Sequence, residues 1–205
     1  MIRLALFGSP IRHSLSPRIH RQFANQGAVE LEYEAIETPR GGLGEALQAL
    51  RASGGLGCNV TLPLKRDALR AAAAASDRAR QAQAANTLLW RRDGWYADNT
   101  DGPGFITDLR ACGIDPGARR VALIGAGGAA AGILATLLGT APDTVELFNR
   151  TEGTAADLAD RHVGLGPVRA RPLAALDGAG RFDLVIHATS AGHGGERAPW
   201  GIGQK

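Results

Sequence analysis

The chain has 205 residues, which is enough for one large or two small domains. Hydrophobic residues make up 44% of it and charged residues 21%, as is typical of a globular protein. The net charge of +3 comes from dispersed side chains without basic runs or interleaved aromatic residues, which argues against nucleic-acid binding. No apolar run approaches the ~18 residues that cross a bilayer, and the two cysteines lack metal-ligand spacing. We therefore expect a cytoplasmic protein with reduced thiols, no metal site and no membrane segment.

The N-terminal stretch predicts a strand followed by a polar turn and a helix. A buried strand is expected over Ile2–Phe7. Ser16 and Pro17 predict a helix start, with Ser16 as the N-cap, and the helix should end near Gln26. Ser14 has no capping role at this spacing. Two hydroxyl groups at a helix N-terminus could instead bind a carboxylate.

The next elements alternate between strands and helices. A strand is expected over Glu32–Ile36, a helix over Gly44–Ser53 and a third strand over Gly57–Thr61. Asn59 and Thr61 lie two residues apart on this third strand, so both should point to the same face. Two polar side chains on one face of an apolar strand indicate an edge that faces a ligand.

Lys65 is the only lysine before the C-terminal residue in a chain that otherwise uses arginine. It opens a helix that we predict over Arg66–Ala75, where its positive charge opposes the helix dipole. Helix stability therefore does not explain its presence. Arginine cannot give up its proton near neutral pH whereas lysine can, so Lys65 suggests proton chemistry. An ordinary exposed lysine is the alternative.

A second polar stretch follows a predicted hairpin that turns at Arg91–Gly94. Asp98–Gly102 lies directly after the second strand of this hairpin and before a helix predicted over Phe105–Cys112. Polar and flexible residues in this position are typical of a binding or catalytic loop. The alternative is that Thr100 or Asp101 merely caps the helix.

The most informative stretch is Val121–Ala130, a short apolar strand that leads into a glycine turn and a helix predicted over Gly128–Leu138. It fits the dinucleotide fingerprint G-x-G-x-x-G/A, with Ala130 in the last position. Gly125 can take the tight turn, and Gly127 lets a pyrophosphate approach the backbone. A glycine turn used only for packing is the alternative, since the motif alone is a weak signal.

The rest of the chain continues the alternation of strands and helices, which predicts parallel, right-handed βαβ units. The strands are expected over Thr144–Phe148, Val168–Ala170 and Asp183–His187, and the helices over Gly153–Arg161 and Pro172–Leu176. The fold class is therefore α/β. We expect an N-terminal α/β substrate domain over residues 1–112 and an incomplete Rossmann-type, doubly wound parallel sheet over residues 118–205.

The strand ends of this second half carry candidate cofactor contacts. Asn149 and Arg150 stand where NAD enzymes place an acidic residue for the ribose 2′-hydroxyl. Arginine at this place favours the 2′-phosphate of NADP, although a surface arginine is the alternative. Thr189 and Ser190 follow the last strand and could touch the nicotinamide side, whereas His187 is more typical of a structural histidine.

Several motifs together resemble the shikimate dehydrogenase family, whose members reduce 3-dehydroshikimate with NADPH. The matching stretches cover the chain to about residue 192, and they are residues 8–17, 59–65, 85–87, 98–102, 125–129, 149–151 and 188–190. The combination of Asn-Val-Thr-x-Pro-x-Lys with Asp-Asn-Thr-Asp-Gly is specific to the family.

The resemblance implies a role for each matching residue. The residues implied to bind the substrate carboxylate are Ser14, Ser16 and Thr61, and those implied to bind the ring hydroxyls are Asn59, Asn86 and Asp101. Lys65 and Asp101 would form the catalytic pair, with Lys65 also in contact with substrate. The residues implied to bind the NADP pyrophosphate are Gly125, Ala126, Gly127, Gly128 and Ala129. Those implied to bind its adenosine phosphate are Asn149, Arg150 and Thr151.

The sequence departs from the family pattern in two places. Glu152–Thr154 stands where the family often has a second basic residue, so we expect a weaker preference for NADP. The family's last strands and returning helix have no counterpart here, which implies a C-terminally truncated chain of low stability. The predicted strand Asp183–His187 would then have an open edge, and Ile19 and Phe23 would face water.

Alternatives to this interpretation differ in chemistry. One is an NAD-using quinate/shikimate dehydrogenase, and the other is a catalytically inactive fragment that only binds substrate or cofactor. The expected partner is a small molecule, shikimate or 3-dehydroshikimate, rather than a nucleic acid or a membrane. The sequence leaves a homodimer open.

Overall fold

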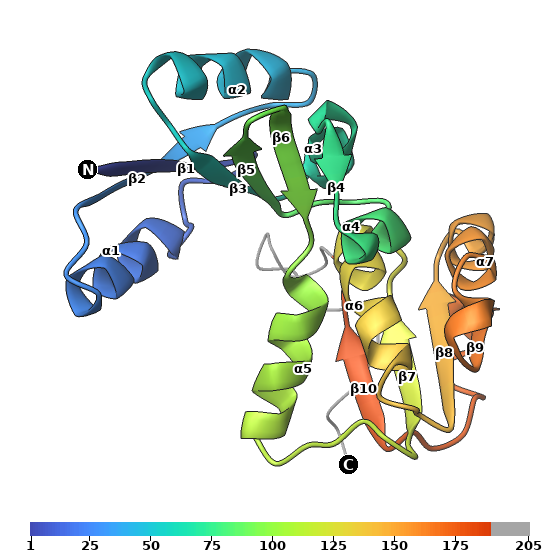
Figure 1. The fold of residues 1–205 in the computed structure, drawn as a ribbon. Helices are drawn as coiled ribbons and strands as arrows, with labels where there is room; N and C mark the ends of the chain where they lie inside the picture. Colours follow the sequence, from blue (N-terminus) through green and yellow to red (C-terminus); the bar gives the residue numbers. More distant parts are fainter. Residues whose placement is uncertain (190–205) are drawn as a thin grey trace.

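Two β-sheets organise the chain, one in each half (Figure 1). The computed structural model describes residues 1–189. The first sheet has six strands in the order β2-β1-β3-β5-β6-β4 and mixes parallel with antiparallel pairs. Its strands are β1 (Ile2–Gly8), β2 (Leu31–Glu37), β3 (Gly57–Val60), β4 (Ala74–Ala75), β5 (Thr87–Arg91) and β6 (Gly94–Asp98).

The second sheet is parallel throughout and has four strands in the order β10-β7-β8-β9. These strands are β7 (Arg120–Ile124), β8 (Thr144–Asn149), β9 (Val168–Pro172) and β10 (Leu184–His187). The chain thus has a mixed β-sheet followed by a parallel, Rossmann-like β-sheet, and helices pack on both sheets. This α/β arrangement confirms the predicted fold class. Within residues 1–189, β10 forms one edge of this sheet, and its Val185 is 40% exposed.

The helices of the first half are α1 (Ser16–Gln26), α2 (Leu43–Ala52), α3 (Lys65–Ala71) and α4 (Asp77–Ala82). α5 (Asp101–Ala111) connects the two halves, and the helices of the second half are α6 (Gly128–Leu138) and α7 (Glu152–Asp160), with short 3-10 turns at Val163–Leu165 and Leu173–Ala175. In Figure 1, α5 and α6 run side by side below the first sheet, where the two halves meet. Over residues 1–189, no helix is both long enough and apolar enough to span a bilayer.

Each sheet has its own hydrophobic core. In the first core Phe7 and Leu64 are fully buried between the sheet and helices α2 and α3. In the second core, α6 buries Leu134 and Leu137 against β7 and β8. Burial of each such side chain contributes about 1.5–3 kcal/mol. Ile106 of α5 packs in the second core, so this helix is held by the Rossmann-like half.

One face of α1 carries exposed apolar side chains. Ile19 is 39% and Phe23 is 60% exposed, as the sequence led us to expect. Leu15, directly before the helix, is 58% exposed. These positions are therefore not part of either core.

The helix start at Ser16 differs from the prediction. Leu15 occupies the N-cap position and makes no side-chain cap hydrogen bond, so the prediction of Ser16 as N-cap is wrong. Ser16 is instead the first helical residue, and its backbone N–H donates to Ser14 Oγ at 3.2 Å. Ser14 therefore does have a local role, because its hydroxyl satisfies one of the free N–H groups at the helix start.

The alanine-rich stretch after Lys65 also differs from the prediction. A single helix to Ala75 is wrong, since α3 ends at Ala71 and the chain then forms β4 and α4. Ser76 caps α4, with its Oγ accepting a hydrogen bond from Ala79 N at 3.2 Å. Alanine favours helices intrinsically, so this interruption depends on pairing with β6, which the local sequence does not encode.

His162 generates a prediction about stability. It is fully buried directly after α7, its Nδ1 is 2.9 Å from the Leu158 carbonyl oxygen, and its Nε2 has no hydrogen-bond partner among the described residues. Burial lowers the pKa of His162 below its ordinary value of 6.5, with Arg161 adding to the effect and the Leu158 hydrogen bond opposing it. The folded state therefore binds this proton less readily than the unfolded state.

We expect the free energy of unfolding to decrease as the pH falls below 6.5, because the unfolded state then takes up the proton first. One such group contributes a slope of at most about 1.4 kcal/mol per pH unit. Urea unfolding between pH 7.5 and 5.5 should show a shallower slope for His162→Gln than for the wild-type chain. The exposed control His13→Gln should keep the wild-type slope, and equal slopes in all three proteins would contradict the account.

Candidate functional site

The carboxyl edge of the first sheet collects residues that are far apart in the sequence. β1 pairs in parallel with β3, whereas β5 is antiparallel to both β3 and β6. The ends of β1, β3 and β6 therefore share one edge with the beginning of β5. The sequence-predicted residues of this region lie on β3 (Asn59), at the starts of α1, α3 and α5 (Ser16, Lys65 and Asp101), and in the loops next to this edge (Ser14, Thr61 and Asn86).

An ion pair lies at the centre of this edge. Lys65 Nζ is 2.5 Å from Asp101 Oδ2, although the two residues are 36 positions apart. Lys65 begins α3 and Asp101 begins α5, and their side chains are only 18% and 23% exposed. The dipole of α5 favours the carboxylate, and the carboxylate in turn offsets the unfavourable position of Lys65 at the start of α3. The structure thus brings the predicted catalytic residues together.

Asn86 orients the other oxygen of the aspartate. Its Nδ2 donates to Asp101 Oδ1 at 2.7 Å and lies 3.0 Å from Thr100 Oγ1. Its Oδ1 accepts from the Thr100 backbone N–H at 3.0 Å. Both carboxylate oxygens of Asp101 are therefore held by charged or polar donors, which fixes the plane of the group.

Asn99 is a residue whose role the sequence did not reveal. It is only 1% exposed, its Oδ1 accepts from the Asp101 backbone N–H at 3.1 Å, and its Nδ2 donates to the Ala84 carbonyl at 3.0 Å. Thr100 occupies the N-cap position without a side-chain cap hydrogen bond, so capping by Thr100 or Asp101 is wrong. The two-residue spacing of Asn99 and Asp101 is the Asx-turn pattern that could have indicated this role. The same signal explains why α5 begins at Asp101 and not at Phe105.

Tyr33, on β2, is a second residue that the sequence did not single out. Its hydroxyl donates to Asn59 Oδ1 at 2.8 Å, which leaves Asn59 Nδ2 directed toward Thr87 Oγ1 at 3.3 Å. Burial raises the pKa of Tyr33 to about 12, with Cys58 adding to the effect and a hydrogen bond from Ser16 opposing it. The phenol therefore keeps its proton at neutral pH and acts as a donor that fixes the Asn59 amide.

The loops after β1 and β3 approach each other closely. A Cβ atom on Gly8 would lie 2.4 Å from Thr61 Cγ2, so only glycine fits at the end of β1. The backbone N–H of Thr61 also donates to the Phe7 carbonyl at 2.9 Å. The loop that carries Ser14 and the residue Thr61 are thereby tied to the same edge of the sheet.

The carboxyl edge of the second sheet carries the glycine turn. Gly125 has φ +111°, and a Cβ atom there would lie 2.7 Å from the Ala188 carbonyl oxygen and 2.9 Å from Thr189 Cγ2. Gly127 is the N-cap of α6, and a Cβ atom on it would have no atom within 4 Å. The turn is therefore closed on the side of β10 and open in front of the helix, as a bound pyrophosphate requires.

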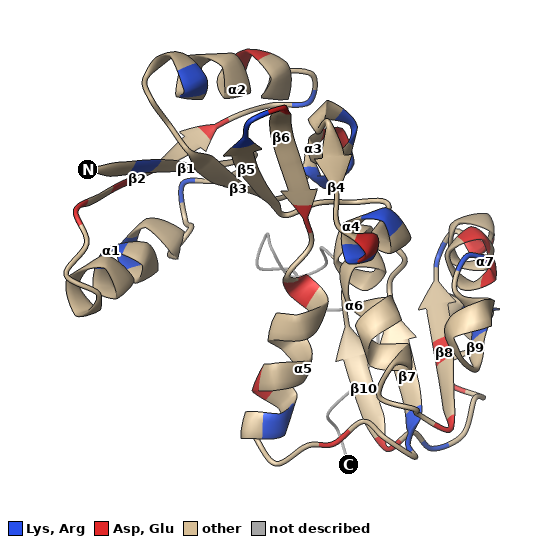
Figure 2. Cartoon of the chain, in the orientation of Figure 1, with Lys and Arg blue, Asp and Glu red and all other residues tan. Residues whose placement is uncertain are grey.

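The chemistry of α6 fits an anionic group at the same place. Figure 2 shows α6 without Lys, Arg, Asp or Glu, in agreement with its sequence over Gly128–Leu138. No acidic side chain of this helix thus competes with the free N–H groups and positive dipole end at its N-terminus. Ala126, Gly128 and Ala129 line the same turn, so the residues present fit the phosphates of a dinucleotide.

The end of β8 presents the predicted adenosine contacts. Asn149 is the last residue of the strand, and its Nδ2 donates to the Thr151 carbonyl at 2.9 Å. Arg150 and Thr151 are exposed, and Thr151 occupies the N-cap position of α7. Arg171, on the neighbouring strand β9, forms an ion pair with Glu146 at 2.8 Å. Thr189 lies beside Gly125, whereas Ser190 falls outside the described residues.

The two edges meet at α6. A Cβ atom on Gly128 would lie 3.7 Å from Lys65 Cδ, and one on Gly132 would lie 2.8 Å from Asp101 Oδ2. The ion pair of the first half therefore lies against the first two turns of the helix that follows the glycine turn. Within residues 1–189, no group of three side chains has the composition and spacing to hold a metal ion.

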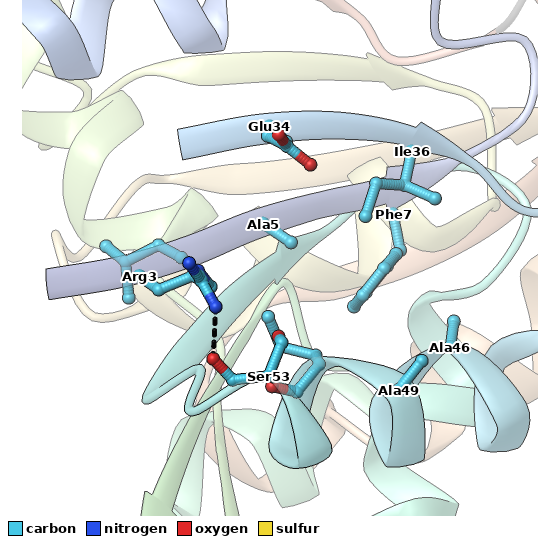
Figure 3. Close-up of a pocket in the computed structure, with 10 residues that line it drawn as sticks. Arg3, Ala5, Phe7, Glu34, Ile36, Ala46, Ala49 and Ser53 are labelled. Carbon is cyan, nitrogen blue, oxygen red and sulfur yellow. Dashed lines mark hydrogen bonds between the residues drawn. The ribbon is translucent and has the colours of Figure 1, made fainter. Parts of the chain in front are cut away.

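A separate apolar pocket of about 200 Å³ lies elsewhere in the first half, beside α2 and over β1 and β2 (Figure 3). Ala5, Phe7 and Ile36 line it, and Arg3 at one end donates to the Ser53 carbonyl oxygen. It contains none of the residues gathered at the carboxyl edges. The predicted catalytic residues therefore lie at the ion pair and not in this pocket.

A lysine–aspartate pair beside a dinucleotide-type glycine turn defines a class of protein, the two-domain oxidoreductases that use a nicotinamide cofactor. Comparison with protein families agrees. Residues 6–88 match the shikimate dehydrogenase substrate binding domain, and residues 113–194 match the shikimate / quinate 5-dehydrogenase family. The chain belongs to the shikimate dehydrogenase family.

Individual relatives cover nearly the whole chain. A shikimate dehydrogenase (NADP⁺) of Chromohalobacter salexigens is 48% identical over 198 residues, which cover 96% of this chain and 72% of the relative. The corresponding protein of Methylococcus capsulatus is 46% identical over 96% of this chain and 71% of its own length.

Solved structures agree with this. An Ael1 enzyme of Pseudomonas putida has a TM-score of 0.87 at 36% identity and covers 97% of this chain and 73% of its own. Shikimate 5-dehydrogenase of Thermus thermophilus, in complex with NADP(H) and shikimate, has a TM-score of 0.83 at 34% identity, over 94% of this chain and 70% of its own.

Proposed function

We propose that the chain is an NADP-dependent shikimate dehydrogenase, which reversibly reduces 3-dehydroshikimate to shikimate in the biosynthesis of chorismate and the aromatic amino acids. The observation that carries this proposal is the Lys65–Asp101 ion pair of 2.5 Å, held against α6 in a chain of this family. A partly buried lysine paired with a carboxylate, close to a glycine turn of the dinucleotide type, has the chemistry that carbonyl reduction needs.

The proposed mechanism assigns the proton to Lys65. NADPH held at the turn Gly125–Ala129 would supply a hydride to the carbonyl carbon, so that negative charge would develop on the carbonyl oxygen. Lys65 Nζ donates a hydrogen bond and then a proton to that oxygen. Asp101 holds the ammonium group through Oδ2 and accepts a hydrogen bond from the substrate hydroxyl. In the oxidation of shikimate the proton moves in the opposite direction, from the substrate hydroxyl to Lys65 Nζ, and Asp101 keeps the same position.

The polar side chains around this pair are proposed to orient the substrate. Ser14, Ser16 and Thr61 would bind its carboxylate, and Asn59 and Asn86 its ring hydroxyls. Support comes from their placement at one edge of the first sheet, on β3 or on the segments next to that edge. Residues 1–112 would form the substrate domain, whose last helix, α5, packs against the second half.

Residues from about 118 onward would form the NADP domain. The turn Gly125–Ala129 would bind the pyrophosphate, and Asn149, Arg150 and Thr151 the adenosine end. Thr189 and Ser190 are proposed to lie on the nicotinamide side. The open space in front of Gly127 supports the first of these assignments.

The proposed setting is the cytoplasm, and the proposed partner is the small-molecule substrate. Both cysteines, Cys58 and Cys112, are free, which suits a reducing compartment. A homodimer is a further proposal that the mass of the protein in solution would test.

The first prediction concerns the catalytic pair. Lys65→Ala should lower kcat for NADP⁺-linked oxidation of shikimate by about 10²- to 10⁴-fold with little change in KM, because the proton donor acts mainly in the transition state. Asp101→Asn should have the same kind of effect. The wild-type chain and the exposed control Arg66→Ala should both reduce NADP⁺, measured by absorbance at 340 nm. Near-normal kcat in Lys65→Ala would show that its assigned role is wrong.

A second prediction concerns Tyr33, which we propose positions Asn59. Tyr33→Phe leaves Asn59 Oδ1 without its donor, so we expect KM for shikimate to rise up to about tenfold while kcat changes less. The chain has two tyrosines, and the other, Tyr96 on β6, provides the matched control. Tyr96→Phe should leave both constants unchanged. Equal effects of the two substitutions would contradict a positioning role.

A third prediction concerns cofactor choice. A charge-assisted contact between Arg150 and the 2′-phosphate of NADP contributes about 1.5–3 kcal/mol, or a preference over NAD of roughly 10- to 100-fold. Arg150→Gln should remove most of this preference in kcat/KM, whereas the exposed Arg161→Gln should retain it. A wild-type preference for NAD would favour the NAD-using quinate/shikimate dehydrogenase instead, and quinate should then be a substrate.

A further inference from the structure

Two buried glycines let α5 and α6 approach each other unusually closely. A Cβ atom on Gly102, in the first turn of α5, would lie 2.3 Å from Thr136 Oγ1 and 2.8 Å from the Gly132 carbonyl oxygen. Real Cβ atoms do not approach other atoms this closely, so the backbones of the two helices are in direct contact here. The contact lies one residue from Asp101, at the point where the two halves of the chain meet.

Gly132 faces the proposed catalytic carboxylate itself. A Cβ atom on Gly132 would lie 2.8 Å from Asp101 Oδ2, 3.1 Å from Asp101 Cβ and 3.2 Å from Asn99 Nδ2. Oδ2 is the oxygen that pairs with Lys65. The missing side chain of Gly132 therefore creates the space in which this oxygen sits.

Glycine is an unfavourable choice at this position unless the space is required. The helix interior around it uses alanine at residues 129–131 and 135, and alanine favours the helix where glycine disfavours it. Gly132 is buried, so solubility does not explain it either. The residues that would contact an added methyl group are Asp101 and Asn99, both of the loop that carries the ion pair.

We propose that Gly132 is a positioning residue that places the Asp101 carboxylate against Lys65 and fixes it relative to the cofactor turn. The proposal rests on the proposed function and deepens it. α6 is anchored by the fully buried Leu134 and Leu137, and Gly132 lies in the same helix whose N-terminus follows the glycine turn. The helix that is proposed to bind the pyrophosphate thereby also sets the position of the proton-transfer pair.

The test compares two glycine-to-alanine substitutions that each add one methyl group to a helix. Gly132→Ala pushes on Asp101 Oδ2, whereas Gly104→Ala, in the same helix as Asp101, has no atom within 4 Å of the new methyl group. We expect kcat to fall roughly 10- to 100-fold in Gly132→Ala, because a displacement of about 1 Å costs this much in rate. KM for NADP⁺ should stay within about twofold, and Gly104→Ala should keep the wild-type kcat.

A double-mutant cycle separates positioning from a general effect on the fold. If Gly132 acts through the carboxylate, Gly132→Ala should cost little further activity once Asp101 is replaced in Asp101→Ala. The proposal would be overturned if the double variant lost activity by the product of the two single-variant losses. An unchanged kcat in Gly132→Ala would overturn it as well. A fall in melting temperature with unaltered kcat in Gly132→Ala would likewise show a purely structural role.

A readout without turnover keeps this proposal separate from the proposed function. The chain has two lysines, Lys65 and Lys205, so ¹³C-dimethylation gives two lysine signals in NMR spectra, and Lys205→Arg assigns them. The Lys65 signal should shift in Gly132→Ala and stay unchanged in Gly104→Ala. Absence of shikimate oxidation by the wild-type chain would refute the proposed function alone. The absence of a shift in Gly132→Ala would refute the positioning role alone.

Discussion

The rest of the structure depends on one constraint, which is that the Lys65 ammonium and the Asp101 carboxylate stay in contact while largely withdrawn from water. Their side chains are 18% and 23% exposed, so each charge has lost part of its hydration. A partly buried ion pair recovers little net stability, because desolvation offsets much of the Coulomb attraction. Stability alone therefore does not explain the pair, whereas the proposed role of Lys65 as a proton donor does.

The arrangement around the pair follows from the geometry of the two sheets. Each sheet directs its functional loops from a carboxyl edge, and the two edges meet at α6. Asn86 and Asn99 hold Asp101 by hydrogen bonds on the side of the first sheet. Gly132 packs against its carboxylate on the side of the second sheet. Because the carboxylate is bounded from both sides, a small relative movement of the halves would change its distance from Lys65. The proposed catalytic geometry is thus a property of the junction between the halves.

Much of the fold could be predicted because its signals are local. The helix after the glycine turn was predicted over Gly128–Leu138 and has these bounds, since glycine, apolar period and strand signals all agree there. The prediction of one helix for the alanine-rich stretch after Lys65 is wrong, because the signal that interrupts this helix is not local. The interruption requires pairing of β4 with β6. Ser16 is predicted as the N-cap, but it is the first helical residue, and Ser14 Oγ accepts the hydrogen bond from its N–H. This is a difference of backbone angle that the residue types do not reveal.

The site was predictable to a different degree. Lys65 stood out because the chain otherwise uses arginine, and the polar stretch that includes Asp101 stood out as a loop. Their contact across 36 residues is a tertiary fact that only the resemblance to the family implied. Tyr33 and Gly132 lie on elements without a polar motif, so nothing local pointed to them. Their importance arises from what the fold places beside them, namely Asn59 and Asp101.

The most direct test of the account follows a labelled hydrogen through the reaction. Shikimate carrying deuterium on the carbon that becomes the carbonyl of 3-dehydroshikimate is incubated with NADP⁺ and the chain, and the reduced cofactor is analysed by mass spectrometry. The account predicts one deuterium per NADPH formed by the wild-type chain, and a rate lowered at least 100-fold in Lys65→Ala. Unlabelled NADPH, or equal rates of transfer in the two proteins, would contradict it.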